Sequence, residues 1–273
     1  MPTVTSSEQT CLDETATFGL GTLTIDHPPG SFAVTPASRI TLEAVGRCQS
    51  HLRGKGVDWG CGSGVLTLAA ARCSGVETVI GLDIEPANIA TSRSNAVTNR
   101  VHNVLFLEAD SFVTLATADA PMLTVHQGQF DFLIANPPAS DGDDGFGFRR
   151  RVLRDARGWL KPGAACLLSI SYQYGSERID RLTAEIPGYT RESCAASTDW
   201  VPFDLSRPDL WDCLLQYVAE ESRGGLPYEF VSPADSSSHP MTAAQALNHF
   251  ERTGQSPLTK WQTFLFRWHG MDA

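Results

Sequence analysis

Short apolar runs rich in β-branched residues alternate along this chain with segments whose apolar residues recur at a helical period. The apolar runs are residues 56–59, 78–82, 104–107, 130–135, 164–171 and 263–268. The helical segments that separate most of them are residues 65–71, 86–98 and 146–160. Because parallel strands need long crossovers and a helix is the usual crossover, this alternation predicts an α/β fold with a doubly wound parallel sheet.

Two regions depart from the alternation, and they predict how the chain is divided. Residues 1–30 have the pattern of a tail that ends in a small strand pair over 19–26. Residues 206–256 carry two helical patterns, 208–221 and 241–252, just before the last strand. Since about 50 residues make a poor core alone, we expect a helical lid or substrate wall there. The expected division is a tail at 1–30, a core at 31–205, the lid at 206–256 and a closing strand of the core within 257–273.

Composition narrows the class of protein. The chain has 273 residues, 42% of them hydrophobic, which is enough for a sizeable core. Its 21 basic and 31 acidic side chains leave a net charge of −10, which argues against nucleic acid as a partner because phosphate neutralisation needs clustered Lys and Arg.

The chain shows neither a secretory signal nor a membrane-spanning run, so we expect a cytoplasmic protein with no membrane partner. Seven scattered cysteines, none spaced as CxxC, argue against disulfides and a metal site. The oligomeric state stays open.

A glycine-rich turn follows the run at 56–59 and leads into the helix at 65–71. It reads DWGCGSG over residues 58–64 and therefore lies at the carboxyl edge of the predicted sheet, where ligands of open α/β folds bind. Asp83 ends the next strand, where a carboxylate can accept hydrogen bonds from ribose hydroxyls. The spacing is GxGxG rather than GxGxxG, and no basic residue within the turn could meet a pyrophosphate. The turn and Asp83 therefore predict a site for a nucleoside without phosphates rather than NAD.

A second polar turn follows the strand at 130–135, which stops at Asn136-Pro137-Pro138 because proline cannot donate to a strand ladder. The chain must leave the sheet there, next to the glycine-rich turn. We expect the Asn136 carboxamide and the carbonyls of Ala135 and Pro137 to converge on one small volume. Converging acceptors suit an NH2 group, because they hold its hydrogens and leave the nitrogen lone pair free to attack. Asn136 and Pro137 are therefore the candidate catalytic residues.

Taken together, these residues resemble the class I S-adenosylmethionine-dependent methyltransferases. The resemblance covers residues 32–163 and the closing strand 263–268, with four motifs in the family's order. It implies S-adenosylmethionine as cofactor and a Rossmann-like sheet of seven mostly parallel strands, the last one antiparallel. The motif implied to wrap the methionine part of the cofactor contains Asp58, Gly60, Cys61, Gly62 and Gly64.

The resemblance also assigns the nucleoside end of the cofactor. It implies that Asp83 binds the ribose and that Ile84 lies beside the adenine. Asp110 is similar to the acidic residue that receives the adenine amino group, and Ser111 would add a backbone donor. Asn136 completes the predicted cofactor-binding set.

The Asn-Pro-Pro element is typical of enzymes that methylate planar nitrogens, among them release-factor glutamine and nucleic-acid adenine or guanine methyltransferases. Residues 29–32 and 35–38 are similar to the segment that precedes the catalytic domain in that group. The aromatic residue expected after the second proline is replaced by Ala139, so a planar acceptor would lose its stacking platform. Predicted substrate contacts, several of them possible substitutes for that aromatic, are Pro138, Phe146 or Phe148, Tyr172, Trp211, Tyr217 and Tyr228.

These features lead to one expected function and two alternatives. The acidic charge, the missing aromatic and the insertion at 206–256 favour an enzyme that methylates a nitrogen, less often an oxygen, of a small molecule, as in specialised metabolism. The first alternative is a protein glutamine-amide or RNA N-methyltransferase. The second is a module that binds the cofactor without transferring a methyl group.

Weaker signals lie around the second polar turn and in the insertion. The acidic stretch 141–145 is interpreted as a solvated loop. The arginines at 149, 150, 151 and 154 are interpreted as an exposed helix face paired with those aspartates, with a grip on a substrate carboxylate as the alternative. His239 and His249 are expected to be surface or structural rather than general bases.

Overall fold

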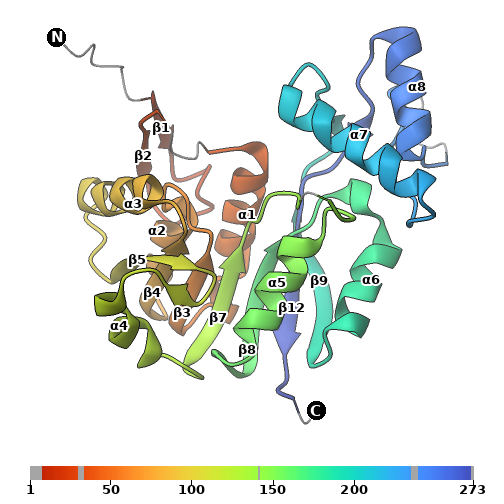
Figure 1. The fold of residues 1–273 in the computed structure, drawn as a ribbon. Coiled ribbons are helices and arrows are strands. Elements are labelled where there is room, and N and C mark those ends of the chain that lie inside the picture. Colours follow the sequence, from red (N-terminus) through yellow and green to blue (C-terminus); the bar gives the residue numbers. More distant parts are fainter. Residues whose placement is uncertain (1–7, 30–33, 141, 235–238, 272–273) are drawn as a thin grey trace.

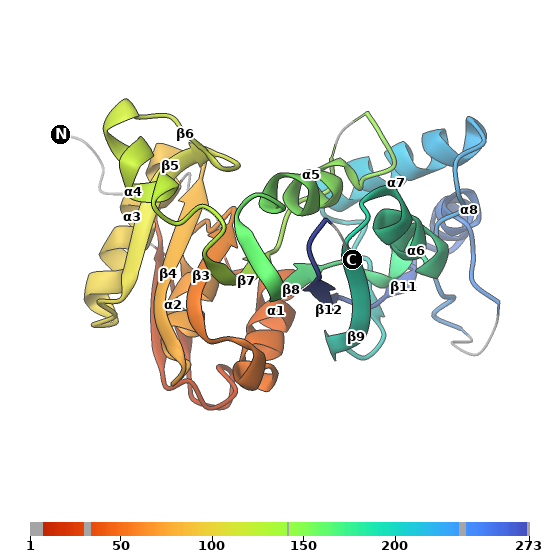
Figure 2. The same ribbon diagram turned by 90° about the horizontal axis from the view of Figure 1, so that it is seen from below.

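The computed structural model describes residues 8–29, 34–140, 142–234 and 239–271. Within these ranges an eight-stranded sheet runs through the molecule with helices on both faces (Figures 1 and 2). In spatial order its strands are β6 (Val113–Thr114), β5 (Val104–Asp110), β4 (Val76–Asp83), β3 (Gly54–Trp59), β7 (Phe130–Ala135), β8 (Leu160–Ser169), β12 (Gln262–Trp268) and β9 (Tyr189–Ser197). Strands β5, β4, β3, β7 and β8 are parallel, and β12 is antiparallel to both of its neighbours. This topology confirms the predicted Rossmann-like α/β class with an antiparallel last strand.

The two faces of the sheet bury two separate hydrophobic clusters, because successive strand residues point to opposite sides. Leu133 of β7 packs in one cluster, while its neighbours Phe132 and Ile134 pack in the other. The Phe132 face is covered by α1 (Pro36–Arg47), α2 (Val65–Ala71) and α3 (Pro86–Thr98). The Leu133 face is covered by α4 (Ala120–Thr124), α5 (Gly147–Ala156) and α6 (Ser176–Glu185). Three short 3-10 turns also occur in the described ranges, η1 (Gln49–His51), η2 (Thr117–Asp119) and η3 (Tyr172–Tyr174).

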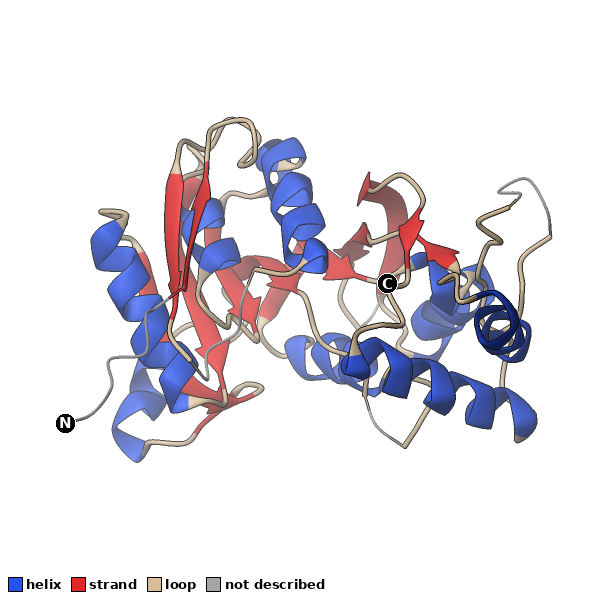
Figure 3. Cartoon of the chain, turned by 90° about the horizontal axis from the view of Figure 1, so that it is seen from above, coloured by secondary structure: helices blue, strands red, loops and turns tan. Residues whose placement is uncertain are grey.

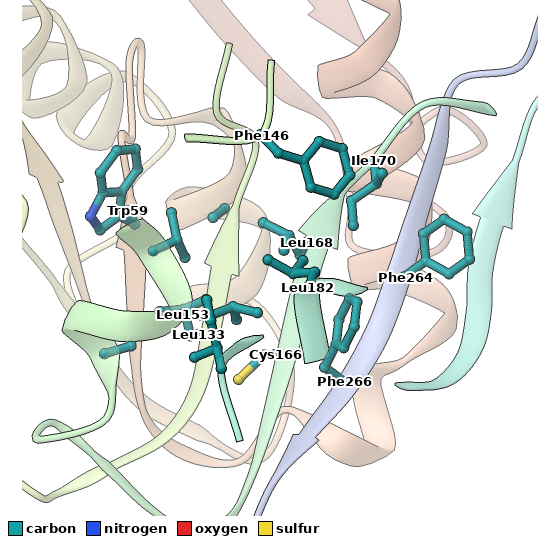
Figure 4. Packing of buried hydrophobic residues seen from close by; sticks show 14 of the residues in the cluster. Trp59, Leu133, Phe146, Leu153, Cys166, Leu168, Ile170, Leu182, Phe264 and Phe266 are labelled. Atoms are coloured by element: carbon teal, nitrogen blue, oxygen red, sulfur yellow. The ribbon is translucent and has the colours of Figure 1, made fainter. Parts of the chain in front are cut away.

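The cluster on the Leu133 face fixes α5 and α6 on the sheet (Figure 4). Leu153 of α5 and Leu182 of α6 are fully buried there with Leu168 of β8 and Phe266 of β12. Each such side chain contributes about 1.5–3 kcal/mol through burial. Because α5 directly follows the loop after Asn136, this packing fixes where that loop ends.

The expected count of seven strands misses β6. Ser111 has a φ of 58°, in the left-handed region, and the chain reverses there so that Val113 pairs with Asp110. Such a short return strand carries no periodicity, so the sequence gives no sign of it.

The N-terminal strand pair also differs from the expectation, which placed it within 19–26. Strand β1 (Glu8–Leu12) pairs with β2 (Leu23–His27), so the two strands are joined by a longer connection. The side chain of Asn99, the C-cap residue of α3, accepts from the Thr24 N–H and donates to the Thr24 carbonyl. Asn95 accepts from the Asp26 N–H and donates to the Ser63 carbonyl, which fastens the hairpin to the glycine-rich turn.

The insertion before the last strand contains α7 (Pro208–Ser222) and α8 (Ala243–Thr253), flanked by the paired strands β10 (Val201–Pro202) and β11 (Leu258–Thr259). Figure 1 shows these helices above β8, β12 and β9, on the side of the carboxyl end of β8, and Figure 3 shows the molecule from above. Leu214, Tyr217 and Ala246 of the insertion are buried in the same cluster as α5 and α6. The division into tail, core, lid and closing strand stays a prediction.

In the ranges that the structure describes, no helix combines the length and the apolar character needed to cross a bilayer. The same ranges hold no group of three or more His, Cys, Asp or Glu side chains suited to a metal ion.

Candidate active site

A cavity of about 310 Å³ lies at the carboxyl edge of the sheet, where β3, β4, β5 and β7 end. Residues of the helices α1, α2, α3 and α5 also line it. It is lined by Ser38, Trp59, Gly60, Cys61, Gly62, Ser63, Val65, Leu66, Leu82, Asp83, Ile84, Asn88, Ala109, Asp110, Ser111, Asn136, Pro138, Phe148 and Arg151. The glycine-rich turn and Asn136 therefore face the same space.

The glycine-rich turn is built so that its backbone forms the floor of this cavity. Gly60, Gly62 and Gly64 all have positive φ, between 54° and 84°, which favours glycine. The Gly60 and Cys61 N–H groups donate to the Leu82 carbonyl, which ties the turn to β4. A Cβ added at Gly60 would meet no atom within 4 Å, so this backbone is open to a ligand. Gly64 instead allows close packing, because a Cβ there would lie 2.9 Å from that of Ser92.

Asp83 is held rigidly at the end of β4. One carboxylate oxygen accepts from the Gly62 N–H at 2.8 Å, and the other accepts from Glu85 N–H at 2.9 Å and Asn88 Nδ2 at 3.1 Å. The side chain is 8% exposed and lines the cavity. A fixed carboxylate with lone pairs to spare suits the hydroxyls of a ribose.

Asp58 lies beneath the turn, behind the residues that line the cavity. It is fully buried, and its Oδ2 accepts from the Thr67 hydroxyl at 2.6 Å. Among the described residues its Oδ1 has no hydrogen-bond partner. Burial raises the pKa of this carboxyl to about 7, against the lowering effect of the Thr67 hydrogen bond. Asp58 is absent from the lining of the cavity, so it supports the turn from beneath, and the open backbone at Gly60 is the part of the turn that a ligand could contact.

The opposite wall is formed by β5 and α5. Ser111 accepts a hydrogen bond of 2.9 Å from the indole N–H of Trp59, and both residues line the cavity. Asp110 lies at the rim, where Arg151 approaches it to 2.7 Å. Asp110 is thus in the predicted place, although its carboxylate already has a cationic partner.

Asn136 lies directly after β7, with its amide facing α1. Its Nδ2 donates to the Ser38 hydroxyl at 3.3 Å, which leaves Oδ1 as the acceptor of the carboxamide. Ser38 is on the first turn of α1, whose N-cap is Thr35. Sequence reasoning missed Ser38, because nothing local in residues 35–38 indicates a contact with a residue 98 positions later.

The Pro137 carbonyl, predicted to face the acceptor, accepts a hydrogen bond from Arg149. Arg149 is 4% exposed, so the interpretation of the arginines as an exposed helix face is wrong for it, whereas the predicted pairing with an aspartate of that stretch is confirmed for Arg150. Arg154 alone of that group is exposed, and Arg150 binds Asp144 through two bonds of 2.6 and 2.7 Å. The loop described from residue 142 is therefore bonded into the fold rather than solvated, while Asp141 lies outside the described residues, as do residues 30–32.

The predicted substrate residues fall into different places. Pro138 lines the cavity, and so does Phe148, which packs 6.2 Å from Trp59. Phe146 is instead fully buried beside Ile170 (Figure 4). Farther from the cavity, Tyr172 packs on Trp200, Trp211 on Phe250, and Tyr228 on Tyr217. His239 is exposed and His249 lies on α8. Of the aromatic residues predicted as substitutes for the one missing at Ala139, Phe148 is the one that lines the cavity.

A Rossmann-like sheet whose cavity joins a glycine floor, a fixed carboxylate at a strand end and an Asn-Pro-Pro turn is typical of a class I S-adenosylmethionine-dependent methyltransferase. Residues 22–186 match the family model of the methyltransferase small domain, and the chain belongs to this family. The protein is therefore an enzyme of this class, with S-adenosylmethionine as its cofactor.

Two relatives are ribosome-modifying enzymes by name. The chain is 30% identical over 203 residues to the ribosomal protein L11 methyltransferase of Geobacter metallireducens, covering 73% of this chain and 56% of that protein. It is 32% identical over 128 residues to the ribosomal RNA small subunit methyltransferase C of Erwinia tasmaniensis, covering 46% and 33%. The chain thus spans about half or less of the length of these relatives.

Among solved structures, the fold is similar to that of the T. thermophilus 16S rRNA N2 G1207 methyltransferase in complex with AdoMet and guanosine. The TM-score is 0.55 at 23% identity, over 70% of this chain and 48% of that one. This likeness concerns the fold.

The relatives contradict two expectations drawn from the sequence. The expected small-molecule acceptor, as in specialised metabolism, is wrong, and so is the argument against nucleic acid, because the relatives are named for a ribosomal protein and for ribosomal RNA. The physical reason is that a net charge of −10 sums the whole surface and says nothing about one local binding face. The absence of an aromatic residue at Ala139 is also no longer an argument against a planar acceptor on a macromolecule, since the aromatic side chain of Phe148 lines the cavity.

Proposed function

We propose that this enzyme methylates a nitrogen carried by a macromolecule, either a protein or an RNA. The observation that supports the proposal is that the Asn136 carboxamide lines the cavity while its Nδ2–H donates a hydrogen bond to the Ser38 hydroxyl. The relatives named for ribosomal protein L11 and for ribosomal RNA support a macromolecular acceptor.

We assign the cavity residues two different roles in this reaction, binding the cofactor and aligning the acceptor. S-adenosylmethionine supplies an electrophilic methyl group on a sulfonium, so the chain's main task is alignment rather than strong base catalysis. Asp83 and the backbone of the glycine-rich turn would hold the cofactor, and Asp110 and Ser111 would hold its adenine end. Correct alignment of this kind accounts for about 7–11 kcal/mol of a barrier.

Asn136 would align the acceptor. Its Oδ1 would accept an N–H of the incoming nitrogen and so direct the lone pair toward the methyl group. Phe148 and Trp59 would provide an apolar surface against the planar group that carries this nitrogen. On transfer, the nitrogen would gain a bond to the methyl carbon while the bond between that carbon and sulfur breaks, the electron pair staying on the sulfur of the demethylated product, and the nitrogen would lose one proton to water.

The proposal is tested by incubating the purified protein with methyl-labelled S-adenosylmethionine and bacterial ribosomal proteins or ribosomal RNA in separate reactions. We expect label in one of these two macromolecular fractions. Asn136→Ala should lower kcat by about 100-fold, because alignment is lost, while the cofactor Kd changes by less than about threefold. The exposed His239→Ala is the control and should match the wild type.

Two results would contradict the proposal. The first is label in neither macromolecular fraction but in a small-molecule extract. The second is an Asn136→Ala variant that methylates the acceptor at the wild-type rate.

A further inference from the structure

Arg149 is a buried cation that the reaction described above does not use. Its side chain lies in the core beside Tyr174 and Phe146, with the guanidinium carbon 4.9 and 5.5 Å from the two ring centroids. Among the described residues no carboxylate lies within ion-pair distance of it. A buried charge without a counter-ion is costly unless its hydrogen bonds are satisfied.

The guanidinium is satisfied by backbone carbonyls alone. Nη2 donates to the Pro137 carbonyl at 3.2 Å, and Nη1 donates to those of Pro138 at 3.0 Å and Gly145 at 3.2 Å. Nε donates to the Ser169 carbonyl at the end of β8, at 3.0 Å. One side chain thus joins both ends of the loop after Asn136 to the neighbouring strand.

The two prolines explain why a side chain is needed there. Neither has a backbone N–H, so this turn cannot be fixed by donors of its own. The buried carbonyl of Pro137 in particular needs an outside donor, because a buried carbonyl left without one costs about 1–3 kcal/mol. Arg149 supplies donors to two consecutive carbonyls, and these fix the plane of the chain directly after Asn136.

We propose that Arg149 is a positioning residue that sets the direction of the Asn136 carboxamide from behind the cavity. This inference rests on the proposed function of Asn136. Without the guanidinium the turn relaxes, and the acceptor of Asn136 no longer points reliably at the incoming nitrogen. The cofactor floor belongs to β3 and β4, so cofactor binding stays intact.

The test compares Arg149→Ala and Arg149→Lys with Arg154→Ala, an exposed arginine on the same helix. Amide hydrogen exchange of the protein without substrate should become roughly tenfold faster or more across residues 142–147 in Arg149→Ala, and stay unchanged at the glycine-rich turn. Lysine should restore only part of the protection, because it lacks the planar fork of donors. Arg154→Ala should match the wild type.

Activity supplies the second measurement. Arg149→Ala should lower kcat by about 100-fold while the cofactor Kd changes by less than about threefold. Millimolar guanidinium or methylguanidinium should restore part of this kcat, by occupying the vacated space. A side chain needed only for stability would show no such rescue.

Several outcomes would overturn the inference. These are unchanged exchange across residues 142–147, a loss of cofactor affinity equal to the loss of kcat, or no rescue by guanidinium. If Arg149→Ala does not fold, the same measurements on Arg149→Lys decide. The exchange experiment needs no acceptor, so it gives its answer even if the wild type methylates neither macromolecule and the proposed function fails.

Discussion

Asp58 and Asp83 lie near the ends of neighbouring strands, yet their carboxylates differ in the number of hydrogen bonds that they accept. Asp83 accepts three hydrogen bonds, one of them from the glycine-rich turn. Asp58 accepts one from Thr67 and is fully buried. The protein thus keeps one carboxylate satisfied by its own donors and the other short of them. The buried carboxylate of Asp58 therefore costs stability when it is charged, because a buried charge with few donors is unfavourable.

At the residue scale we therefore predict that Asp58→Asn stabilises the protein without cofactor above neutral pH. Burial raises the pKa of Asp58 from 3.8 to about 7 in the folded state. The raised pKa means that the folded protein favours the protonated carboxyl. The contribution of this group to the free energy of unfolding is therefore fully present below about pH 4 and is lost as the pH rises through about 7. At pH 8 the asparagine variant, which carries no such charge, should be more stable by up to about 4 kcal/mol.

Urea unfolding of both proteins from pH 4 to pH 8 measures this difference. The advantage of Asp58→Asn should shrink as the pH falls. A difference in stability that does not vary with pH would show that Asp58 does not titrate in this range.

At the scale of elements, the insertion and the loop after Asn136 are joined by a buried polar network. The Tyr228 hydroxyl donates to the Asp144 carbonyl at 3.0 Å. Arg178 is 1% exposed and donates to the carbonyls of Tyr174 and Leu226, each at 2.6 Å. The α7–α8 insertion is thus bonded to the loop that follows Asn136. This supports the proposal that residues 206–256 form a wall for the acceptor.

Removing one bond of this network tests how much it contributes. Tyr228→Phe should lower the free energy of unfolding by about 1–2 kcal/mol, because the hydroxyl is lost and the Asp144 carbonyl is left without its donor. Cofactor affinity should stay the same, since Tyr228 packs on Tyr217 rather than in the cavity. Tyr172→Phe, a half-buried tyrosine of η3, is the control. Equal unfolding midpoints for the wild type and Tyr228→Phe would show that the bond contributes nothing.

Sequence patterns located best the elements whose ends carry a glycine or a proline. The predicted bounds of α2, α3 and β7 agree with the structure, because α2 begins after Gly64, α3 begins at Pro86 and β7 ends just before Asn136 and Pro137. The glycine-rich turn was predictable for the same reason, since its glycines stand between a strand and a helix. Local patterns do not reveal Ser38, whose contact with Asn136 depends on how α1 packs.

Arg149 shows a signal that could have been used. It stands at i with Val152, Leu153 and Ala156 at i+3, i+4 and i+7, so it belongs to the buried stripe of α5 rather than to an exposed face. Its position in a run of three arginines hid this spacing. The stripe identifies burial, but the carbonyl partners follow only from the tertiary structure.

At the scale of the whole molecule, the cavity draws on elements from most of the first half of the chain, from Ser38 of α1 to Arg151 of α5. A ligand that touches all of them binds the folded state alone. At a concentration of 100 times its Kd, S-adenosylmethionine should therefore stabilise the fold by about 2.7 kcal/mol.

That stabilisation should raise Tm by roughly 5–10 °C for a chain of this size. Thermal unfolding followed by fluorescence, with cofactor and with its demethylated product, measures the shift. Asp83→Ala should reduce it, since the variant loses the fixed carboxylate. A full shift in Asp83→Ala would remove Asp83 from the cofactor site.

The contact between Ser38 and Asn136 has a consequence for anyone who wants a shorter enzyme. A fragment starting at β3 would keep every glycine of the turn and every acidic group of the cavity, and it would look complete by its motifs. It would nevertheless lack the hydroxyl that orients the amide, and the surface of the sheet that α1 covers would be bare. The smallest useful version of this fold must begin upstream of Thr35, well before the glycine-rich turn.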